Sequence, residues 1–389
     1  MHVKEKIERY FLSVINNERH SKGSSVLRFF LKQLSKLYEL IVTLRLYFYR
    51  IGILRYHTLG CQVISIGNLT VGGTGKTPIV EIFARELTKE GRRVAVLSRG
   101  YKRKKAPFFQ RLKERLSMDY NPKAPLVVSD GDTVFLNSAI GGDEPYMLAT
   151  NLPGVCVLVD KDRVKSGQYA IDKLKCDTLI LDDGFQYLRL KHTHEIVLVD
   201  STNPFSNEQV LPRGLLREPV RNIARSDFIF LTKATGLNPN GLKDRIKTLN
   251  AVAEISECRH APKYLQDCQT DETKPLEFLH GKRIAAVSGI ASPAGFESAL
   301  RGLGAHLVYI KRYTDHHRFT GKEIDQIIDV ATLKGVELII TTEKDAVRLP
   351  LPENMNIPVY YLRVEIELLS GSEDFRACIS RICFRDHEN

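Results

Sequence analysis

A glycine-rich turn between an apolar run and a helical pattern is the segment of this sequence best suited to chemistry. Residues 67–78 read GNLTVGGTGKTP and follow the β-branched run 62–66. In such a turn, backbone N–H groups surround phosphate oxygens, and the lysine and threonine that follow hold the phosphates and magnesium. The residues expected to bind ATP are Gly72, Gly73, Thr74, Gly75, Lys76 and Thr77. The segment predicts phosphoryl chemistry with ATP and Mg²⁺, although Thr70 stands where the usual motif has its first glycine.

A second apolar run, residues 178–181, ends in two adjacent carboxylates, Asp182 and Asp183. A phosphate loop needs an acidic partner for its magnesium ion on a neighbouring strand. Adjacent side chains at a strand end point in different directions, so one carboxylate can reach the metal while the other orients its neighbours. Thr77, Asp182 and Asp183 are therefore the expected metal residues, with either aspartate as the direct ligand.

Transfer to an alcohol also requires a group that orients or deprotonates the attacking hydroxyl. Residues 142–145 (GDEP) place two carboxylates at the start of a helical pattern, which on its own is also the sequence of an ordinary helix N-terminus. Residues 315–317 (DHH) lie in a polar stretch, which on its own predicts solvated loop histidines. Together the two segments offer an aspartate–histidine couple, in which one member holds the charge and tautomer of the other.

The elements around these residues alternate between short β-branched runs and longer helical patterns. This alternation predicts an α/β fold with a mostly parallel sheet covered by helices. The expected strands are 62–66, 93–97, 155–159, 178–181, 196–199, 228–231, 283–287, 306–310, 337–340 and 359–362. Helical patterns follow residue 78 and cover 146–151, 295–301 and 322–333. The expected parts are an N-terminal segment 1–55, a P-loop nucleotide-binding domain 56–280 and a smaller α/β domain 281–389, with no clear period over 236–282.

The N-terminal segment predicts a long amphipathic helix. Charged residues interrupt every window that approaches the ~20 apolar residues of a spanning helix, so the segment is not expected to cross a bilayer. It also lacks the apolar core and the cleavage site of a secretory signal, so export is not expected. Apolar residues recur at helical spacing with basic residues between them: Phe30, Leu34, Leu37, Ile41, Leu44 and Phe48. This pattern is typical of a helix in the headgroup region of an anionic membrane. The alternative is a helix packed on its own domain.

The amino-acid composition indicates which classes of partner the chain is expected to bind. The chain has 57 Lys plus Arg against 46 Asp plus Glu, a formal charge of +11 that favours anionic partners. No basic platform interleaved with aromatic residues appears, so nucleic acid is not expected. The seven cysteines form no C-x-x-C pair, which argues against a zinc site or a disulfide framework and for a reducing cytoplasm.

Taken together, these motifs resemble the tetraacyldisaccharide 4′-kinase family, the lipid A 4′-kinases of Gram-negative bacteria. The resemblance extends from about residue 47 to about residue 349. It is carried by residues 67–78, 98–101, 142–145, 181–186, 215–219, 288–291, 315–317 and 342–345. Thr70 is itself typical of this family. The resemblance implies a membrane-associated kinase that moves the γ-phosphoryl of ATP to the 4′-hydroxyl of a tetraacylated, 1-phosphorylated glucosamine disaccharide, giving lipid IVA.

The resemblance also implies roles for single residues. Asp143 would be the general base with His316 as its partner, and Lys76 would act on the phosphates. Arg99 and Tyr101 would face the anionic glycolipid, and Glu218 would lie at the nucleotide cleft. The protein would work at the cytoplasmic face of the bacterial inner membrane, and no obligate protein partner is expected.

Two departures from the family limit this comparison. Ser206 stands where the family has glycine, and residues 102–123 form a longer and more basic stretch than is usual. A different class of protein, a P-loop switch ATPase, would explain the phosphate loop and the strand-end acids but not Asp143 and His316. Within the kinase interpretation, Asp183 is the alternative to Asp143 as base.

Overall fold

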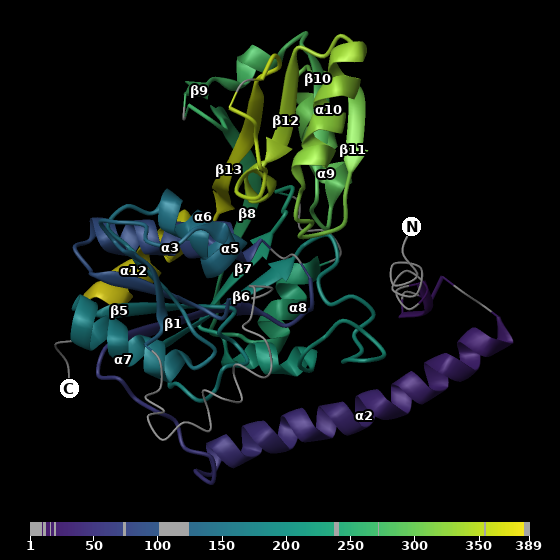
Figure 1. The fold of residues 1–389 in the computed structure, drawn as a ribbon. Helices are drawn as coiled ribbons and strands as arrows, with labels where there is room; N and C mark the ends of the chain where they lie inside the picture. Colours follow the sequence, from purple (N-terminus) through teal and green to yellow (C-terminus); the bar gives the residue numbers. More distant parts are fainter. Residues whose placement is uncertain are drawn as a thin grey trace, which may run out of the picture. The chain divides into compact units, whose positions relative to one another are not determined.

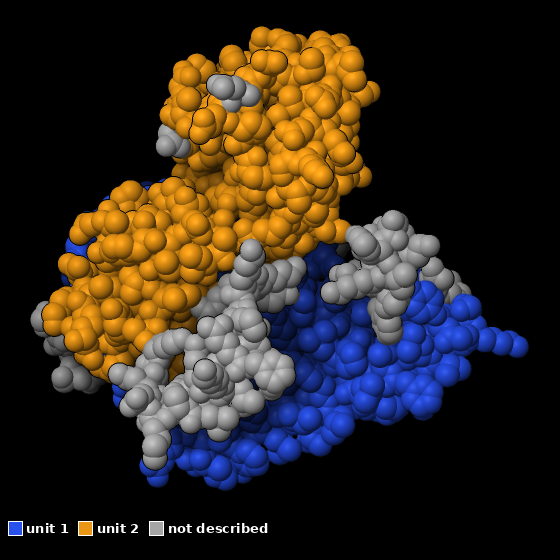
Figure 2. Space-filling view, viewed as in Figure 1, with its two compact units in different colours: residues 1–92, 177–259, 368–389 blue, residues 93–176, 260–367 orange. Residues whose placement is uncertain are grey.

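The structure, a computed structural model, describes residues 21–72, 75–100, 124–236, 241–270, 272–353 and 355–384, together with residues 10, 13–15, 17 and 18. These residues form two compact units (Figure 2). Unit 1 comprises residues 1–92, 177–259 and 368–389, and unit 2 comprises residues 93–176 and 260–367. Each unit is thus built from segments that are far apart in the sequence. The consecutive domains expected over 56–280 and 281–389 divide the chain differently and stay a prediction.

Unit 1 is built on parallel strands in the order β5-β1-β6-β7-β8. The strands are β1 (Gln62–Asn68), β5 (Thr178–Asp182), β6 (His194–Asp200), β7 (Phe228–Thr232) and the first residues of β8 (Glu254–Asp267). All seven residues of β1 and all five of β5 are buried. Burial on both faces is what a parallel sheet covered by helices requires, and it explains the unbroken apolar runs.

Helices cover both faces of this sheet (Figure 1). On one face, Phe83 of α3 (Lys76–Lys89) and Phe375 of α12 (Ser372–Phe384) pack with Phe228 and Phe230, with ring centroids 4.9 to 6.4 Å apart. The other face packs against α8 (Leu242–Leu249), and η1 (Val220–Arg225) contributes to the same apolar cluster. The sheet therefore fixes the strand ends from which the phosphate loop and the paired carboxylates project.

The long helix α2 (Lys22–Arg50) belongs to unit 1 and has an unusual distribution of side chains. Ser35 is buried, donates to Val210 O at 2.8 Å and accepts from Arg213 N at 2.9 Å, so a polar residue faces the protein. The six apolar residues predicted to form one face are all exposed, from 36% at Phe48 to 59% at Phe30. None of the helices in the described part of the chain is long and apolar enough to cross a membrane.

Unit 2 contains two groups of strands. The first runs β2-β4-β3, with β2 (Val94–Ser98) parallel and β3 (Leu126–Asp130) antiparallel to β4 (Cys156–Val159). It carries α5 (Ser138–Gly141), α6 (Asp143–Asn151) and α7 (Arg163–Leu174). The second group is parallel and runs β11-β10-β12-β13: β10 (Arg283–Ser288), β11 (His306–Arg312), β12 (Leu338–Thr342) and β13 (Val359–Ser370).

Side chains of β10 alternate between two apolar cores. Ile284 and Ala286 face α9 (Pro293–Gly302), and Ala285 and Val287 face α10 (Gly321–Leu333). The remaining elements of unit 2 are η3 (Leu276–Leu279), α11 (Glu343–Ala346) and β9 (Thr273–Lys274), which pairs antiparallel with the end of β8.

The predicted fold class is confirmed: the protein is a mixed α/β chain with mostly parallel strands and a long N-terminal helix. Each predicted strand overlaps an observed one. The sequence analysis missed β3, β8 and β9, and the stretch 236–282, which showed no clear period, contains α8 as well. All seven cysteines are free thiols in the structure.

Candidate active site

The phosphate loop connects β1 to α3 in unit 1. Gly75 caps α3 with φ 79° and ψ 34°, a left-handed conformation that glycine adopts without strain, and Lys76 is the first helical residue. Lys76 Nζ lies 3.3 Å from Asn68 Oδ1 and 3.6 Å from Asp183 Oδ1. Thr77 follows, half-buried, at the start of the helix. Gly72 is exposed, and Gly73 and Thr74 lie outside the described residues.

The two carboxylates follow β5, the strand beside β1. The parallel register places Asp182 opposite Ile66, at the end where the phosphate loop begins. Asp182 is 7% exposed, whereas the side chain of Asp183 is 36% exposed and its φ is 57°. Both oxygens of Asp183 lie 2.8 Å from Nη1 of Arg217, a residue to which the sequence analysis gave no role. Lys76 and Arg217 therefore share Asp183.

Residues 215–218 run beside the start of the phosphate loop. Val71 N donates to Leu215 O at 2.7 Å, and Arg217 N donates to Leu69 O at 2.7 Å. Thr70 forms an isolated antiparallel bridge with Leu216. A β-branched residue suits this extended conformation, which accounts for threonine where the usual motif has glycine. The motif 215–219 therefore supports the phosphate loop, and its arginine reaches the strand-end acid.

Glu218, expected at the nucleotide cleft, is 3% exposed. Its oxygens accept from Asn222 Nδ2 at 2.7 Å and from Arg225 Nη2 at 3.3 Å. Burial raises the pKa of Glu218, and the charge of Arg225 and the hydrogen bond from Asn222 only partly oppose this effect. The Arg225 guanidinium also lies 4.1 Å from the centre of the Phe185 ring, so the cation that pairs with Glu218 is itself packed against an aromatic side chain.

The donor set of unit 1 fits magnesium. A threonine hydroxyl at the start of α3 and carboxylates at the end of the neighbouring strand are hard oxygen ligands, which Mg²⁺ prefers. Mg²⁺ usually binds one or two carboxylates and takes its other ligands from phosphates and water. Within the described ranges, no three or more His, Cys, Asp or Glu side chains gather in a group that could hold a metal ion.

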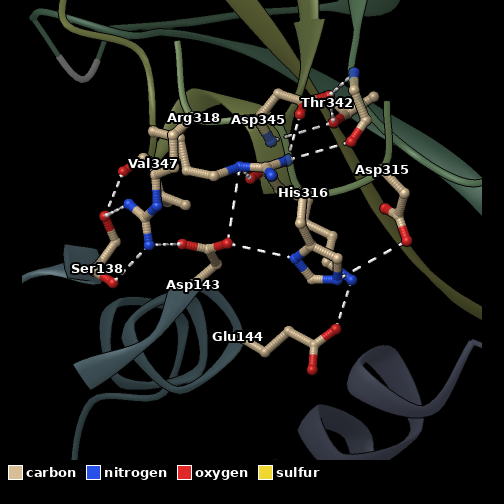
Figure 3. A network of polar contacts seen from close by, with 12 residues as sticks. Ser138, Asp143, Glu144, Asp315, His316, Arg318, Thr342, Asp345 and Val347 are labelled. Carbon is tan, nitrogen blue, oxygen red and sulfur yellow. Dashed lines mark hydrogen bonds and ion pairs between the residues drawn. The ribbon is translucent and has the colours of Figure 1, made fainter. Parts of the chain in front are cut away.

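The candidate proton acceptor lies in unit 2 (Figure 3). Asp143 is the first residue of α6, follows Gly142 with φ 102° and is 7% exposed. Its Oδ2 lies 3.4 Å from Nδ1 of His316, which comes from the loop after β11. These residues are 173 positions apart in the chain. The structure therefore brings together the aspartate and the histidine that the sequence offered as a couple.

The neighbouring histidine has a different partner. His317 Nε2 lies 3.0 Å from Glu323 Oε1, and its ring stacks on Tyr313 at a centroid distance of 4.5 Å. Glu323 belongs to the capping box of α10 with Thr320. His317 therefore fixes the start of a helix, and His316 is the histidine that reaches Asp143.

Two arginines that the sequence analysis did not identify complete this cluster. Arg318 Nη2 donates to Asp143 Oδ1 at 2.6 Å and to Ser138 O at 3.1 Å (Figure 3). Arg348 Nε lies 3.8 Å from Asp143 Oδ2. Burial alone raises the pKa of Asp143, but the hydrogen bond with His316 and the charges of Arg318 and Arg348 outweigh it and lower the pKa. Asp143 is therefore ionised well into the acidic range.

The residues expected to face a glycolipid are only partly described. Arg99 is exposed and directly follows β2 in unit 2. Tyr101 and the basic stretch 102–123 lie outside the described residues. The roles expected for Arg99 and Tyr101 stay predictions.

Comparison with known proteins identifies the family. A family model described as "Tetraacyldisaccharide-1-P 4'-kinase" matches residues 27–383. This chain belongs to that family. A tetraacyldisaccharide 4′-kinase of Anaeromyxobacter dehalogenans is 40% identical over 337 residues, covering 85% of this chain and 84% of the relative. One from Halothermothrix orenii is 32% identical over 396 residues, covering 97% and 99%.

A solved structure agrees with this membership of the tetraacyldisaccharide-1-P 4′-kinase family. The "apo" form of LpxK from Aquifex aeolicus in complex with ATP aligns with a TM-score of 0.71 and 31% identity, covering 92% of this chain and all of that one. The resemblance of the motifs is thereby confirmed, and the chain is a kinase of the lipid A pathway family.

Proposed function

We propose that this chain transfers the γ-phosphoryl of ATP, with Mg²⁺, to the 4′-hydroxyl of a tetraacyldisaccharide 1-phosphate, giving lipid IVA at the cytoplasmic face of the bacterial inner membrane. Family membership supports the reaction and the glycolipid substrate. The Aquifex aeolicus relative, whose structure is described as a complex with ATP, supports the nucleotide. The metal, the membrane face and the roles of single residues are this proposal's own additions.

The observation that carries the proposal is the contact between Asp143 and His316. A phosphate loop followed by strand-end acids is also what a P-loop switch ATPase would have. Such an ATPase has no need for a buried aspartate paired with a histidine in another part of the chain. A kinase with an alcohol acceptor does, because the hydroxyl must be oriented and must lose its proton.

Unit 1 supplies the phosphate-binding groups. Lys76 stabilises the charge on the phosphoryl group, and the backbone N–H groups of the loop orient the phosphates. Thr77 and Asp182 are the residues we assign to Mg²⁺, which when bound neutralises phosphate charge. Asp183 lies beside Lys76 and Arg217, so we assign it to orienting these cations, with a place near the metal.

Unit 2 supplies the proton acceptor. The 4′-oxygen bonds to the γ-phosphorus, the bond to the ADP oxygen breaks, and the hydroxyl proton passes to Asp143. A low pKa makes Asp143 a weak base, but the loose transition state of phosphoryl transfer places more demand on position than on base strength. His316 holds the carboxylate in place. Asp183 is the poorer candidate because two cations already bind it.

The lipid-facing part of the proposal rests on α2, with Arg99 and Tyr101 assigned to the anionic disaccharide. The outward apolar residues of α2 suit the headgroup region of a bilayer, and the formal charge of +11 favours an anionic surface. The alternative, that these apolar residues pack on the protein itself, does not agree with their exposure.

The test is transfer of labelled phosphate from ATP to the monophosphorylated disaccharide lipid, followed by thin-layer analysis. Asp143→Ala and His316→Ala are each expected to lower kcat by about 10²–10⁴-fold, with little change in the KM for ATP. The double variant should be far less than additive, because the two residues act as one unit.

His317→Ala is the matched control. It removes an imidazole from the adjacent position, where the ring contacts Glu323 and not Asp143, so turnover should stay within a few-fold of wild type. If Asp143→Ala also stays within a few-fold while Asp183→Ala is inactive, Asp183 is the base and the couple is not.

A further inference from the structure

A buried ion pair lies next to the Asp143–His316 couple. Asp345 of α11 and Arg348, three residues later, form this pair, and the side chains of both are 0% exposed. Thr342 fixes the aspartate, because its Oγ1 donates to Asp345 Oδ2 at 2.7 Å and accepts from Asp345 N at 3.2 Å (Figure 3). Residues 342–345 are among the motifs that carried the family resemblance, yet no chemistry explains them so far.

The ion pair contacts both the backbone N–H and the backbone carbonyl of one residue, Gly289. Asp345 Oδ2 accepts from Gly289 N at 2.9 Å. The carbonyl oxygen of Gly289 accepts from the backbone N of His316 at 3.0 Å and from Arg348 Nη2 at 3.4 Å. Gly289 therefore connects the pair to the backbone of His316, and residues 288–291, a second motif without an assigned role, acquire one.

The same guanidinium also reaches the other member of the couple. Arg348 Nε donates to Lys344 O at 3.0 Å and lies 3.8 Å from Asp143 Oδ2. Arg348 therefore contacts Asp143 directly and His316 through Gly289.

We propose that the Asp345–Arg348 ion pair positions the Asp143–His316 couple for proton transfer. This inference rests on the proposed role of the couple as proton acceptor. Both side chains are 0% exposed, so we assign them no contact with the substrate; they act by fixing where the carboxylate and the imidazole lie.

The backbone of His316 explains why such positioning is needed. Its φ is 61°, a left-handed conformation that is strained for a residue with a side chain of this size and persists only where its surroundings hold it. The hydrogen bond from His316 N to Gly289 O is a contact that holds this conformation. Loss of the pair would free Gly289, and the His316 backbone could then relax toward a negative φ.

A contribution to folding stability explains the Asp345–Arg348 pair less well than a positioning role does. Removing two charges from water costs as much as their attraction returns in many buried pairs, so a buried ion pair contributes little to stability on balance. Within the described residues, Arg348 Nη1 is also buried without a hydrogen-bond partner, which adds to this cost. Because burying this pair costs free energy, the geometry that it imposes on its neighbours explains it better.

The test is a double-mutant cycle with purified full-length protein and the lipid transfer assay. Asp345→Asn should lower kcat about 10–100-fold, because a misplacement of about 1 Å is enough for such a loss, while the KM values for ATP and lipid stay near wild type. In the His316→Ala background, the same substitution should change kcat by less than about threefold, because the couple acts as one unit and no longer works once its imidazole is gone.

Glu297→Gln is the matched control. Glu297 is a carboxylate of unit 2 that is 2% exposed, and Arg312 binds both of its oxygens, at 2.6 and 2.8 Å. This change should lower the unfolding temperature while leaving kcat near wild type, both alone and in the His316→Ala background. It separates loss of a buried, ion-paired carboxylate from loss of positioning.

The possible failures are distinguishable. If His316→Ala and Asp143→Ala retain near-wild-type turnover, the couple is not the proton acceptor and the positioning inference falls with it. If the couple is essential but the effects of Asp345→Asn and His316→Ala multiply, only the positioning inference is wrong.

A second variant covers the case in which Asp345→Asn does not fold. Gly289→Ala keeps every charge but places a Cβ 3.1 Å from Asp345 Oδ1 and 3.3 Å from Thr314 O, which must displace the pair or the loop that carries His316. It should lower kcat and show the same coupling to His316→Ala. Full turnover by Gly289→Ala, with both contacts shifted, would overturn the inference.

Discussion

Lys76 shows how much depends on one cation at the phosphate loop. Its side chain is 17% exposed, and its ammonium group lies beside Asn68 and Asp183. Lys76→Ala should lower kcat by at least about 10²-fold, because a preorganised charge on the transferring group is lost. The fold should remain, since no core cavity forms. The transfer assay and a thermal unfolding curve measure the two expectations separately.

Lys89→Ala is the control for this change. Lys89 is the last residue of the same helix, with a side chain 60% exposed and paired only locally with Glu86 in the contacts described. It should leave kcat and the unfolding temperature almost unchanged. Near-normal turnover by Lys76→Ala would contradict the assignment of the phosphate loop.

Arg318 controls the charge around Asp143. Arg318→Met removes a cation 2.6 Å from the carboxylate, so the pKa of Asp143 should rise from its lowered value. Asp143 must be ionised to accept a proton. The pH at which kcat/KM falls on the acidic side should therefore move upward. A pH–rate profile for the transfer reaction measures this shift.

The same change should alter stability at low pH, and the sign follows from the lowered pKa. A carboxyl group whose pKa is lowered on folding stabilises the protein above its unfolded-state pKa, and this contribution is lost as the pH falls through the folded-state pKa. Arg318→Met should reduce this stabilising contribution of Asp143. Arg318→Lys keeps the charge, so it should partly restore both the stability at low pH and the pH–rate profile. If kcat/KM of Arg318→Met falls at the same acidic pH as that of the wild type, Arg318 does not set the pKa of Asp143.

Single residues differ in how far the sequence could predict them. Lys76 stands in a motif whose chemistry is local, so its position follows from residues 67–78 alone. Residues 142–145 and 315–317 were combined because transfer to an alcohol needs a proton acceptor, and the family resemblance implied that His316 is the partner of Asp143. Arg318 was not identified, although it directly follows the two histidines, because its partner is 175 positions away. Arginine in a polar loop is common, and only the folded chain shows that this one binds Asp143.

At the scale of elements, burial decides what the sequence reveals. Strands β1, β5 and β7 are buried on both faces and stand out as unbroken apolar runs. Strand β8 was missed because much of it is only partly buried and carries charged residues such as Glu254 and Lys263. Strand β3, which pairs antiparallel with β4, was missed because it is short and only partly buried.

The turn at Ser206 has a backbone conformation that favours the glycine of the family, and this leads to a prediction about stability. Ser206 has φ 53°, in the left-handed region where glycine is favoured, and glycine is what the family pattern predicts here. Ser206→Gly should raise the free energy of unfolding by about 1 kcal/mol, because the left-handed strain is removed. Thermal or denaturant unfolding measures this difference.

Ser206→Ala separates the backbone from the side chain. It removes the hydroxyl but keeps a Cβ at the same φ, so it should not stabilise the protein. If alanine and glycine have equal effects, the hydroxyl and not the backbone conformation determines the stability of this turn.

For the whole molecule, the division into units was the part least accessible from sequence. The sequence analysis placed two domains one after the other, whereas each compact unit draws on separate segments of the chain. Local patterns report strands and helices, but which of them pack together depends on contacts between residues far apart in sequence. Net charge, by contrast, is a sum over the chain, so the preference for anionic partners needs no structure.

The outward apolar face of α2 leads to a prediction about the whole protein at a membrane. Leu34, Leu37 and Ile41 are 53%, 55% and 56% exposed. If each buries its remaining apolar surface in a bilayer, the three contribute about 3 kcal/mol, so the triple substitution to Gln should weaken binding to anionic vesicles about 10²-fold. The KM for lipid should rise. The KM for ATP should stay constant, because the substituted side chains are exposed on α2 and do not belong to the phosphate loop. Vesicle sedimentation and the transfer assay measure these effects.

Substituting Val252 and Leu333 by Gln is the matched control. Both are apolar and 87% exposed, more so than the α2 residues, but neither belongs to the helix. If exposed apolar surface alone drove binding, this control would weaken it as well. If the amphipathic helix is the anchor, the control should bind like wild type, and the inward contacts of Ser35 should keep α2 folded in the triple variant. A triple variant that still sediments fully with vesicles would show that membrane binding depends on another part of the chain.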